Sequence, residues 1–213
     1  AMAEAHSVAV DPHKWLYAPL EAGCALVRDP RLLIETFSHR PPYYHFEEGA
    51  AEHDLINYFE HGLQNSRGFR ALKVWLGLRQ AGRAGHVQMI EDDISVARAL
   101  FRAAEGNPEL EAVTQSLSIT TFRYLPVDLR ERRESAAVAE YLNKLNTELL
   151  NRIQRGGEAF LTNAVVRGRF VLRACVVNFH STPADAEAVA GIAVRVGREI
   201  DKEIRPPELW NME

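Results

Sequence analysis

The chain has 213 residues, of which 46% are hydrophobic and 25% charged, with 13 glycines, 10 prolines and 2 cysteines. This composition is typical of a globular protein and excludes a disordered chain, a collagen-like repeat and a disulfide scaffold. Its 25 basic and 29 acidic residues leave a net charge of −4, too small and too evenly mixed for a surface that binds nucleic acid or a membrane. The length fits one large domain or two small ones.

Two features bear on where the protein works. Cys24 and Cys175 lie far apart and show no CxxC spacing, so we expect two reduced, partly buried thiols in a reducing compartment. No apolar run approaches the roughly 20 residues that span a bilayer, and the first residues lack the pattern of a secretory signal. These observations predict a cytoplasmic protein. The chain also enters a strand almost at once, which predicts that another part of a larger protein completes its first sheet.

The first third of the chain predicts a strand, a loop and a returning strand. A short strand over Ser7–Val10 ends at Asp11-Pro12, and a compact apolar strand over 22–27 ends before a second proline. A short helix is expected over Arg31–Phe37. The polar stretch that begins at Arg40 has no period, which is typical of a long surface loop.

From Phe69 the hydrophobic period becomes helical, with a break at Gly82 and Gly85. A half-buried strand is then expected over 117–125, a helix over 134–155, a hairpin of strands over 159–166 and 169–178, and a last helix over Pro183–Ile204. The part after Gly82 is therefore predicted to be a small α+β unit, in which helices cover antiparallel strands.

Lys14 is the first candidate for chemistry. It directly follows His13 at the end of a short strand, and its next neighbours are Trp15, Leu16 and Tyr17, which are bulky. A lysine that is desolvated in such surroundings becomes a nucleophile that can form a Schiff base with an aldehyde. The alternative is a surface lysine whose stem packs on Trp15.

Three segments resemble the group II amino-acid decarboxylases, which include the aromatic-amino-acid, histidine and glutamate decarboxylases. They are SVAVDPHKWLYAPLEAGCALVRD, SRGFRALKVWLGLRQAGRAG and GRFVLRACVVN, in the order that the family has them. The resemblance implies an α/β fold of the aminotransferase-like type (fold type I) and the carboxyl-terminal part of such an enzyme. Residues 1–82 would be the end of the large cofactor-binding domain, which is incomplete, and residues 83–213 the small carboxyl-terminal α+β domain.

The resemblance also implies a cofactor, pyridoxal 5'-phosphate. Lys14 would form the Schiff base with it, and His13 would help to hold it near its phosphate. Other groups of the family that contact the cofactor lie upstream of the lysine, so none is expected here. Asp11 departs from members that have asparagine near the phosphate, and we expect its carboxylate to turn toward a backbone or side-chain donor instead.

Tyr43 is the second catalytic candidate that the resemblance implies. Phe37, Pro41 and Tyr43 match the spacing of the family's mobile loop, whose tyrosine returns a proton to the substrate after carbon dioxide leaves. A phenol does this only when loop closure brings it within hydrogen-bond reach and excludes water. Tyr44 is an alternative proton donor, and a pair of tyrosines that anchors the loop by packing is an alternative role.

Arg173 and Arg67 are the substrate-binding candidates. Arg173 matches an arginine of the last strand that contacts a substrate carboxylate in some members, a task that suits a bidentate guanidinium. Arg67 matches the arginine before the long helix, although Gly68 stands where many relatives have a second arginine. The alternative for both residues is a structural salt bridge. No histidine or carboxylate spacing predicts a metal site.

The expected function is therefore that of a carboxy-lyase which converts an L-amino acid to its amine and carbon dioxide. We expect activity to need the amino-terminal part, in the same precursor or as a separate chain, and a homodimer or larger assembly, as in the family. Two other functions stay open. One is a non-catalytic structural or partner-binding fragment, and the other is a related pyridoxal-phosphate enzyme that makes an aldehyde by oxidative deamination.

Overall fold

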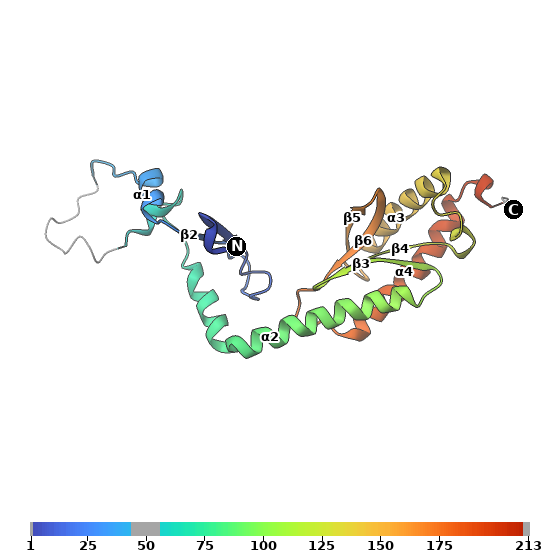
Figure 1. The fold of residues 1–213 in the computed structure, drawn as a ribbon, viewed down its shortest axis with the longest axis horizontal. Helices are drawn as coiled ribbons and strands as arrows, with labels where there is room; N and C mark the ends of the chain where they lie inside the picture. Colours follow the sequence, from blue (N-terminus) through green and yellow to red (C-terminus); the bar gives the residue numbers. More distant parts are fainter. Residues whose placement is uncertain (1, 44–55, 211–213) are drawn as a thin grey trace. The chain divides into compact units, whose positions relative to one another are not determined.

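The computed structural model describes residues 2–43 and 56–210. It forms two compact units, Ala1–Arg83 and Ala84–Glu213, which are coloured in chain order in Figure 1. The long helix α2 (Arg70–Glu105) passes through the boundary and loses its helical geometry at Gly82, where φ is +62°. Glycine adopts this left-handed conformation without a steric penalty, and the predicted break at Gly82 is therefore confirmed.

The first unit contains an antiparallel pair of strands, β1 (Ser7–Val10) and β2 (Cys24–Val27), with Ser7 opposite Val27. A helix, α1 (Arg31–Phe37), and a short 3₁₀ turn, η2 (Tyr58–His61), follow. Both strands and α1 confirm the expected elements. The second strand starts two residues later than expected, because the main chain of Ala22 bonds to a histidine side chain instead of a neighbouring strand.

The second unit is a four-stranded antiparallel sheet with three helices. The strands lie in the order β3 (Leu110–Ser116), β4 (Ile119–Tyr124), β6 (Arg169–Cys175) and β5 (Thr162–Val166), and the last two helices are α3 (Ala136–Gly156) and α4 (Pro183–Ile204). Short 3₁₀ turns complete the assignment, at Met2–Glu4 (η1), Val127–Leu129 (η3) and Pro207–Leu209 (η4). The helix expected over 134–155 and the hairpin are confirmed, and α4 has the expected bounds.

The single strand expected over 117–125 is wrong at its start. Leu117 has a φ of +50° and lies with Ser118 in the tight turn that joins β3 to β4. Strand β3 was not expected, because it lies at an edge of the sheet and its polar residues hide the alternation of a half-buried strand.

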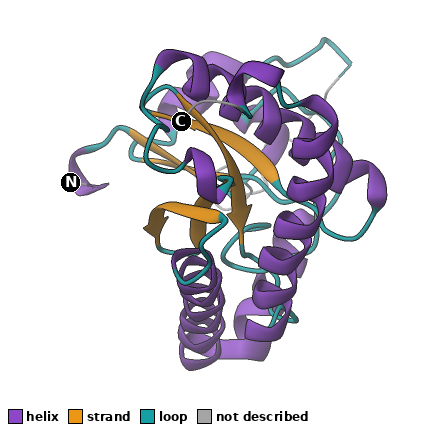
Figure 2. Cartoon of the chain, turned by 90° about the vertical axis from the view of Figure 1, so that its right-hand side faces the viewer, coloured by secondary structure: helices purple, strands orange, loops and turns teal. Residues whose placement is uncertain are grey.

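Helices α2, α3 and α4 each contact β4, and Figure 2 shows the helices beside the strands of this unit. From α2, the main-chain oxygen of Ala97 accepts a hydrogen bond of 2.6 Å from Thr120 Oγ1. From α3, the side chain of Asn146 accepts from the main-chain nitrogen of Tyr124 at 2.8 Å and donates to its oxygen at 2.9 Å. An asparagine of the helix thus replaces the ladder bonds that β4 lacks at its end.

Tyr124 is also the contact point of the third helix. Its ring packs so closely on α4 that a Cβ atom at Gly197 would lie 2.5 Å from the ring. Its hydroxyl donates to Glu109 at 3.2 Å, and Glu109 pairs with Arg198 of α4. Burial raises the pKa of the Tyr124 phenol, and the bond from Arg198 holds the pKa of Glu109 below its ordinary value.

A buried ion pair anchors the end of α4. Asp201 accepts hydrogen bonds from Tyr141 at 2.5 Å and from Arg205 at 2.6 Å. Arg205 also bonds to Asp128 and lies over the ring of Trp210, with 4.1 Å between the guanidinium carbon and the ring centroid. Because every buried charge here has a partner, α4 is held against α3 and η3.

Cys24 and Cys175 are free thiols, but both are exposed, so the expected partial burial is wrong for this chain. Each residue stands at an end of its strand. Within the described residues, no helix is long and apolar enough to cross a membrane.

The Tyr124 contact predicts opposite effects for two glycines of α4. Gly197→Ala should destabilise the protein by about 1–3 kcal/mol through overpacking, because the gain from removing a helical glycine is at most about 1 kcal/mol. Gly191→Ala is the matched control, since no atom lies within 4 Å of the added Cβ, and it should be neutral or stabilising. Denaturant unfolding of the two variants measures the difference. Equal stabilities would show that Tyr124 does not constrain α4.

Candidate active site

Lys14 stands on a tight turn that directly follows β1. The main chain closes the turn, with hydrogen bonds from Lys14 N to Asp11 O at 2.9 Å and from Ala18 N to Pro12 O at 3.0 Å. The Lys14 side chain is 65% exposed, and its Nζ lies 2.7 Å from Asp11 Oδ2. The turn therefore presents a charged, accessible amine beside one carboxylate.

Of the two alternatives for Lys14, a desolvated amine and a surface lysine, the described residues show an exposed amine. The large neighbours of Lys14 do not cover its amine, because the turn directs it toward solvent. Asp11 turns to a side-chain donor, as expected, and the hydrogen bond from Lys14 holds the pKa of Asp11 below its ordinary value. An exposed ion pair of this kind is weak, so Lys14 can leave Asp11 at little cost.

His13 joins the end of β1 to the start of β2. Its Nδ1 lies 2.6 Å from the main-chain oxygen of Ala22 and 3.4 Å from the main-chain nitrogen of the same residue. The shorter distance decides the tautomer, because a lone pair of Nδ1 would repel the oxygen. Nδ1–H therefore donates to Ala22, and Nε2 is the nitrogen that remains for another ligand.

Glu60 is a residue that sequence reasoning missed. It is 5% exposed and accepts hydrogen bonds from Ser38 Oγ at 2.9 Å and from Arg40 Nε at 2.8 Å, so it ties the end of α1 to η2. Tyr43 follows Arg40 by three residues and is 73% exposed. Tyr44 lies outside the described residues. A buried glutamate thus holds the base of the segment that carries the tyrosine candidate, and only its place in a short apolar stretch marks it in the sequence.

The two arginine candidates have neutral partners. Arg67 donates from Nη2 to the main-chain oxygen of Tyr58 in η2. Arg173, on β6, donates from Nη1 to Thr162 Oγ1 at 3.4 Å. Neither guanidinium forms an ion pair with a described carboxylate, so a structural salt bridge is not their role within this part of the chain.

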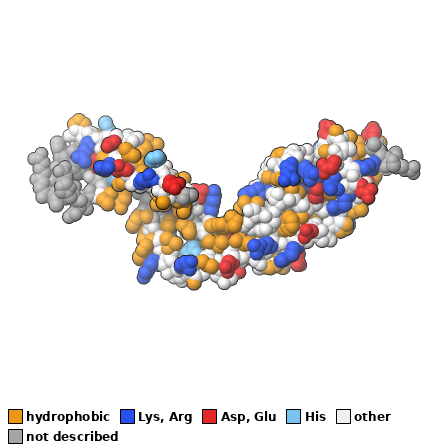
Figure 3. All heavy atoms as spheres, in the orientation of Figure 1, with side chains coloured by type: hydrophobic (Ala, Val, Ile, Leu, Met, Phe, Trp, Pro, Cys, Tyr) orange, Lys and Arg blue, Asp and Glu red, His pale blue; other side chains and the backbone are white. Residues whose placement is uncertain are grey.

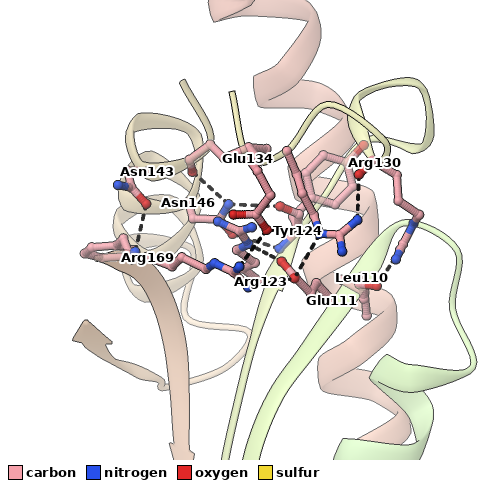
Figure 4. A network of polar contacts seen from close by, with 12 residues as sticks. Leu110, Glu111, Arg123, Tyr124, Arg130, Glu134, Asn143, Asn146 and Arg169 are labelled. Atoms are coloured by element: carbon pink, nitrogen blue, oxygen red, sulfur yellow. Dashed lines mark hydrogen bonds and ion pairs between the residues drawn. The ribbon is translucent and has the colours of Figure 1, made fainter. Parts of the chain in front are cut away.

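Other arginines on the same face of the sheet are paired. Thr121 lies opposite Arg173, and because side chains alternate along a strand, Arg123 of β4 and Arg169 of β6 share the face of Arg173. Figure 4 shows that Arg123 and Arg169 both point to Glu111. Arg173 is therefore the arginine of these three whose charge no described carboxylate balances.

The five candidates do not form one described site. The structure brings Lys14 and His13 together on one turn. It bonds Arg67 to Tyr58 of η2, and it bonds Arg40, three residues before Tyr43, to Glu60 of η2. Arg173 belongs to the second unit, which is described by itself.

The sequence model of the pyridoxal-dependent decarboxylase conserved domain matches residues 2–124, which is more than half of the chain. The chain belongs to the pyridoxal-dependent decarboxylase family. The Lys14 turn, the segment from α1 to η2 and the helix α2 all lie within the matched residues. The predicted family and its pyridoxal cofactor class are therefore confirmed.

Individual relatives agree with this family. The chain is 36% identical over 179 residues to an aromatic-L-amino-acid decarboxylase of Bacillus atrophaeus, covering 84% of the chain and 36% of that protein. It is 31% identical over 173 residues to a phenylacetaldehyde synthase of a Rosa hybrid cultivar, covering 81% of the chain and 34% of that protein. The chain thus spans about a third of the length of these relatives.

A solved structure shows the fold. The Oryza sativa protein TDC, crystallised with PLP and tryptamine, matches with a TM-score of 0.79 and 25% identity, over 93% of this chain and 40% of that one. The structural neighbours of this chain are decarboxylases of fold type I, so the expected fold class is confirmed.

The hydrogen bonds that Glu60 accepts from Ser38 and Arg40, called here the Glu60 clamp, predict that the stability of the α1–η2 region depends on pH. Because the bond from Arg40 holds the pKa of Glu60 below its ordinary value, the clamp stabilises the α1–η2 region above the unfolded value of about 4.3 and is lost as pH falls through the lower folded value. Glu60→Gln should speed hydrogen exchange in α1 by about fivefold at pH 7, with a smaller effect at pH 3. Glu35→Gln, on the exposed side of α1, is the control. An effect of Glu60→Gln that stays equal at both pH values would contradict the clamp.

Proposed function

We propose that this chain is the carboxyl-terminal part of a pyridoxal-phosphate-dependent amino-acid decarboxylase, which converts an L-amino acid to its amine and carbon dioxide. The observation that carries the proposal is the Lys14 turn, where an accessible amine and an oriented imidazole follow a strand within the segment that matches the family. The relatives support the reaction class, because they include an aromatic-L-amino-acid decarboxylase.

Lys14 and His13 fit the two ends of the cofactor. The Lys14 amine would hold the cofactor aldehyde covalently once it has given up its proton and left Asp11. His13 would contact the phosphate through Nε2. Because Nδ1–H already donates to Ala22, a hydrogen bond from Nε2 to a phosphate oxygen requires the imidazolium form, whose charge suits an anion. When bound, pyridoxal phosphate withdraws electrons from the substrate α-carbon, and the protein selects which bond breaks.

Arg173 and Arg67 would orient the substrate. Arg173 forms no ion pair with a described carboxylate, and this supports a role in binding the substrate α-carboxylate. A guanidinium without such an ion pair can form a bidentate pair with a ligand. Arg67 uses one donor on Tyr58, and a guanidinium has further N–H groups that could bond to a ligand. Tyr43, exposed in this chain, would deliver a proton from Oη to the substrate α-carbon after carbon dioxide leaves.

An assembly is part of the proposal. Large hydrophobic side chains are exposed at Phe69 and along the first half of α2, where Figure 3 shows hydrophobic side chains gathered. Those on α2 include Leu72, Trp75, Leu76 and Leu78. Contiguous apolar surface of this extent is typical of an interface. We therefore propose that the amino-terminal part, in the same polypeptide or as a separate chain, and a second copy of the enzyme complete the assembled enzyme. A cytoplasmic location remains part of this proposal.

The role of Lys14 can be tested by trapping. Borohydride reduction of the assembled enzyme with pyridoxal phosphate should attach the cofactor to the peptide that contains Lys14, as measured by mass spectrometry. Lys14→Ala should abolish the attachment and the activity, whereas Lys73→Ala, on α2, should retain both. If the cofactor does not attach to Lys14 in the unchanged protein, the chain is a non-catalytic fragment.

Tyr43 separates decarboxylation from the second candidate function. The similarity to a phenylacetaldehyde synthase favours oxidative deamination to an aldehyde as that candidate. Tyr43→Phe should lower amine formation by about 10²- to 10⁴-fold, the usual contribution of a general acid, and should raise the share of aldehyde. Tyr58→Phe, another exposed tyrosine of this unit, should leave the product ratio unchanged. Chromatography of the products measures the ratio of amine to aldehyde. An unchanged rate of amine formation in Tyr43→Phe would overturn the role of Tyr43 as the proton donor.

A further inference from the structure

Arg173 lies between two threonines at the same register of the sheet. Thr121 of β4 and Thr162 of β5 both stand directly opposite Arg173 of β6, so the three side chains form a row across one face. Their hydroxyls have different partners. The Oγ1 of Thr121 bonds to Thr114 Oγ1 at 2.7 Å and accepts from Thr114 N at 3.0 Å, so it is engaged toward β3.

The Thr162 hydroxyl is engaged toward Arg173. It donates to the main-chain oxygen of Arg173 at 3.2 Å and accepts from Arg173 Nη1 at 3.4 Å. A hydroxyl has one proton and two lone pairs, so both bonds form at once. One side chain of the edge strand thus holds the main chain and the guanidinium of Arg173 together.

Thr162 is a neutral partner of Arg173, whereas the neighbouring arginines have a charged partner. Arg123 and Arg169, on the same face, are held by the carboxylate of Glu111, which balances charge as it orients them. Thr162 orients Arg173 through a neutral oxygen and leaves its charge available. The bond to Thr162 uses one N–H of Nη1 out of the five N–H donors of a guanidinium, so other donors can pair with a ligand.

We propose that Thr162 is a positioning residue for a carboxylate ligand of Arg173. The inference rests on the proposed function, in which Arg173 binds the α-carboxylate of the substrate, and it adds the group that sets the direction of the guanidinium. A residue with this role improves the binding of ligands that carry the carboxylate and has no effect on ligands that lack it.

The test compares two probes that differ in the carboxylate alone, L-phenylalanine and 2-phenylethylamine, by their dissociation constants from the assembled enzyme. Thr162→Val keeps the shape and the strand preference of the side chain but removes the hydroxyl. It should weaken L-phenylalanine binding by about three- to tenfold, the effect of one hydrogen bond, with 2-phenylethylamine unchanged. Thr162→Ser, which restores the hydroxyl, should recover most of the loss.

Two further variants separate the possible failures. Thr121→Val removes a hydroxyl at the same register on the other side of Arg173, and it should leave the preference for L-phenylalanine intact. Arg173→Gln should abolish that preference. If the unchanged protein shows no preference, or Arg173→Gln keeps it, the proposed role of Arg173 fails and this inference with it. If Arg173→Gln abolishes the preference but Thr162→Val and Thr162→Ser both match the unchanged protein, the role of Thr162 alone is overturned.

Discussion

The second unit depends on the way Tyr124 is held. Two helices and a turn meet at this residue: its main chain is bonded by Asn146 of α3, its ring leaves no room for a side chain at Gly197 of α4, and its hydroxyl reaches Glu109 in the turn before β3. Each contact uses a different part of the residue, so all three are satisfied together. Because β4 is a central strand, this contact sets how the helices lie on the sheet.

The two faces of the sheet have different tasks. The face that bears Phe122 and Leu172 is covered by helices and forms the hydrophobic core. The other face bears arginines, and Arg123 is only 1% exposed, with two guanidinium nitrogens that have no partner among the described residues. Burial of such a charge is tolerated because Glu111 pairs with it. Arg173, which lies farther along the same face, is held by a neutral group, and this difference separates a structural arginine from a candidate ligand-binding one.

The first unit positions chemistry by short-range contacts. The sequence Asp11-Pro12 ends β1 and begins the turn that presents Lys14, since proline cannot continue the strand ladder. His13 then ties this turn to the start of β2 through Ala22. These bonds are local, whereas the apolar surface of α2 stays exposed within the described residues. The unit therefore has an ordered site but an uncovered surface, as a part of a larger domain would have.

The sequence alone determined the elements whose signals are local. The period of α3 and α4, the prolines after β1 and β2 and the glycine break at Gly82 were all readable, and the resemblance carried by three segments together identified the family. The edge strand β3 and the turn at Leu117 were not readable, because an edge strand is stabilised by one neighbour and needs no alternating pattern. Only the tertiary structure showed that Lys14 is exposed, that Glu60 joins α1 to η2, and that Arg173 bonds to a neutral threonine and to no described carboxylate while Arg123 and Arg169 share Glu111. Burial and pairing are set by residues that lie far apart in the chain, and a sequence pattern does not contain their distances.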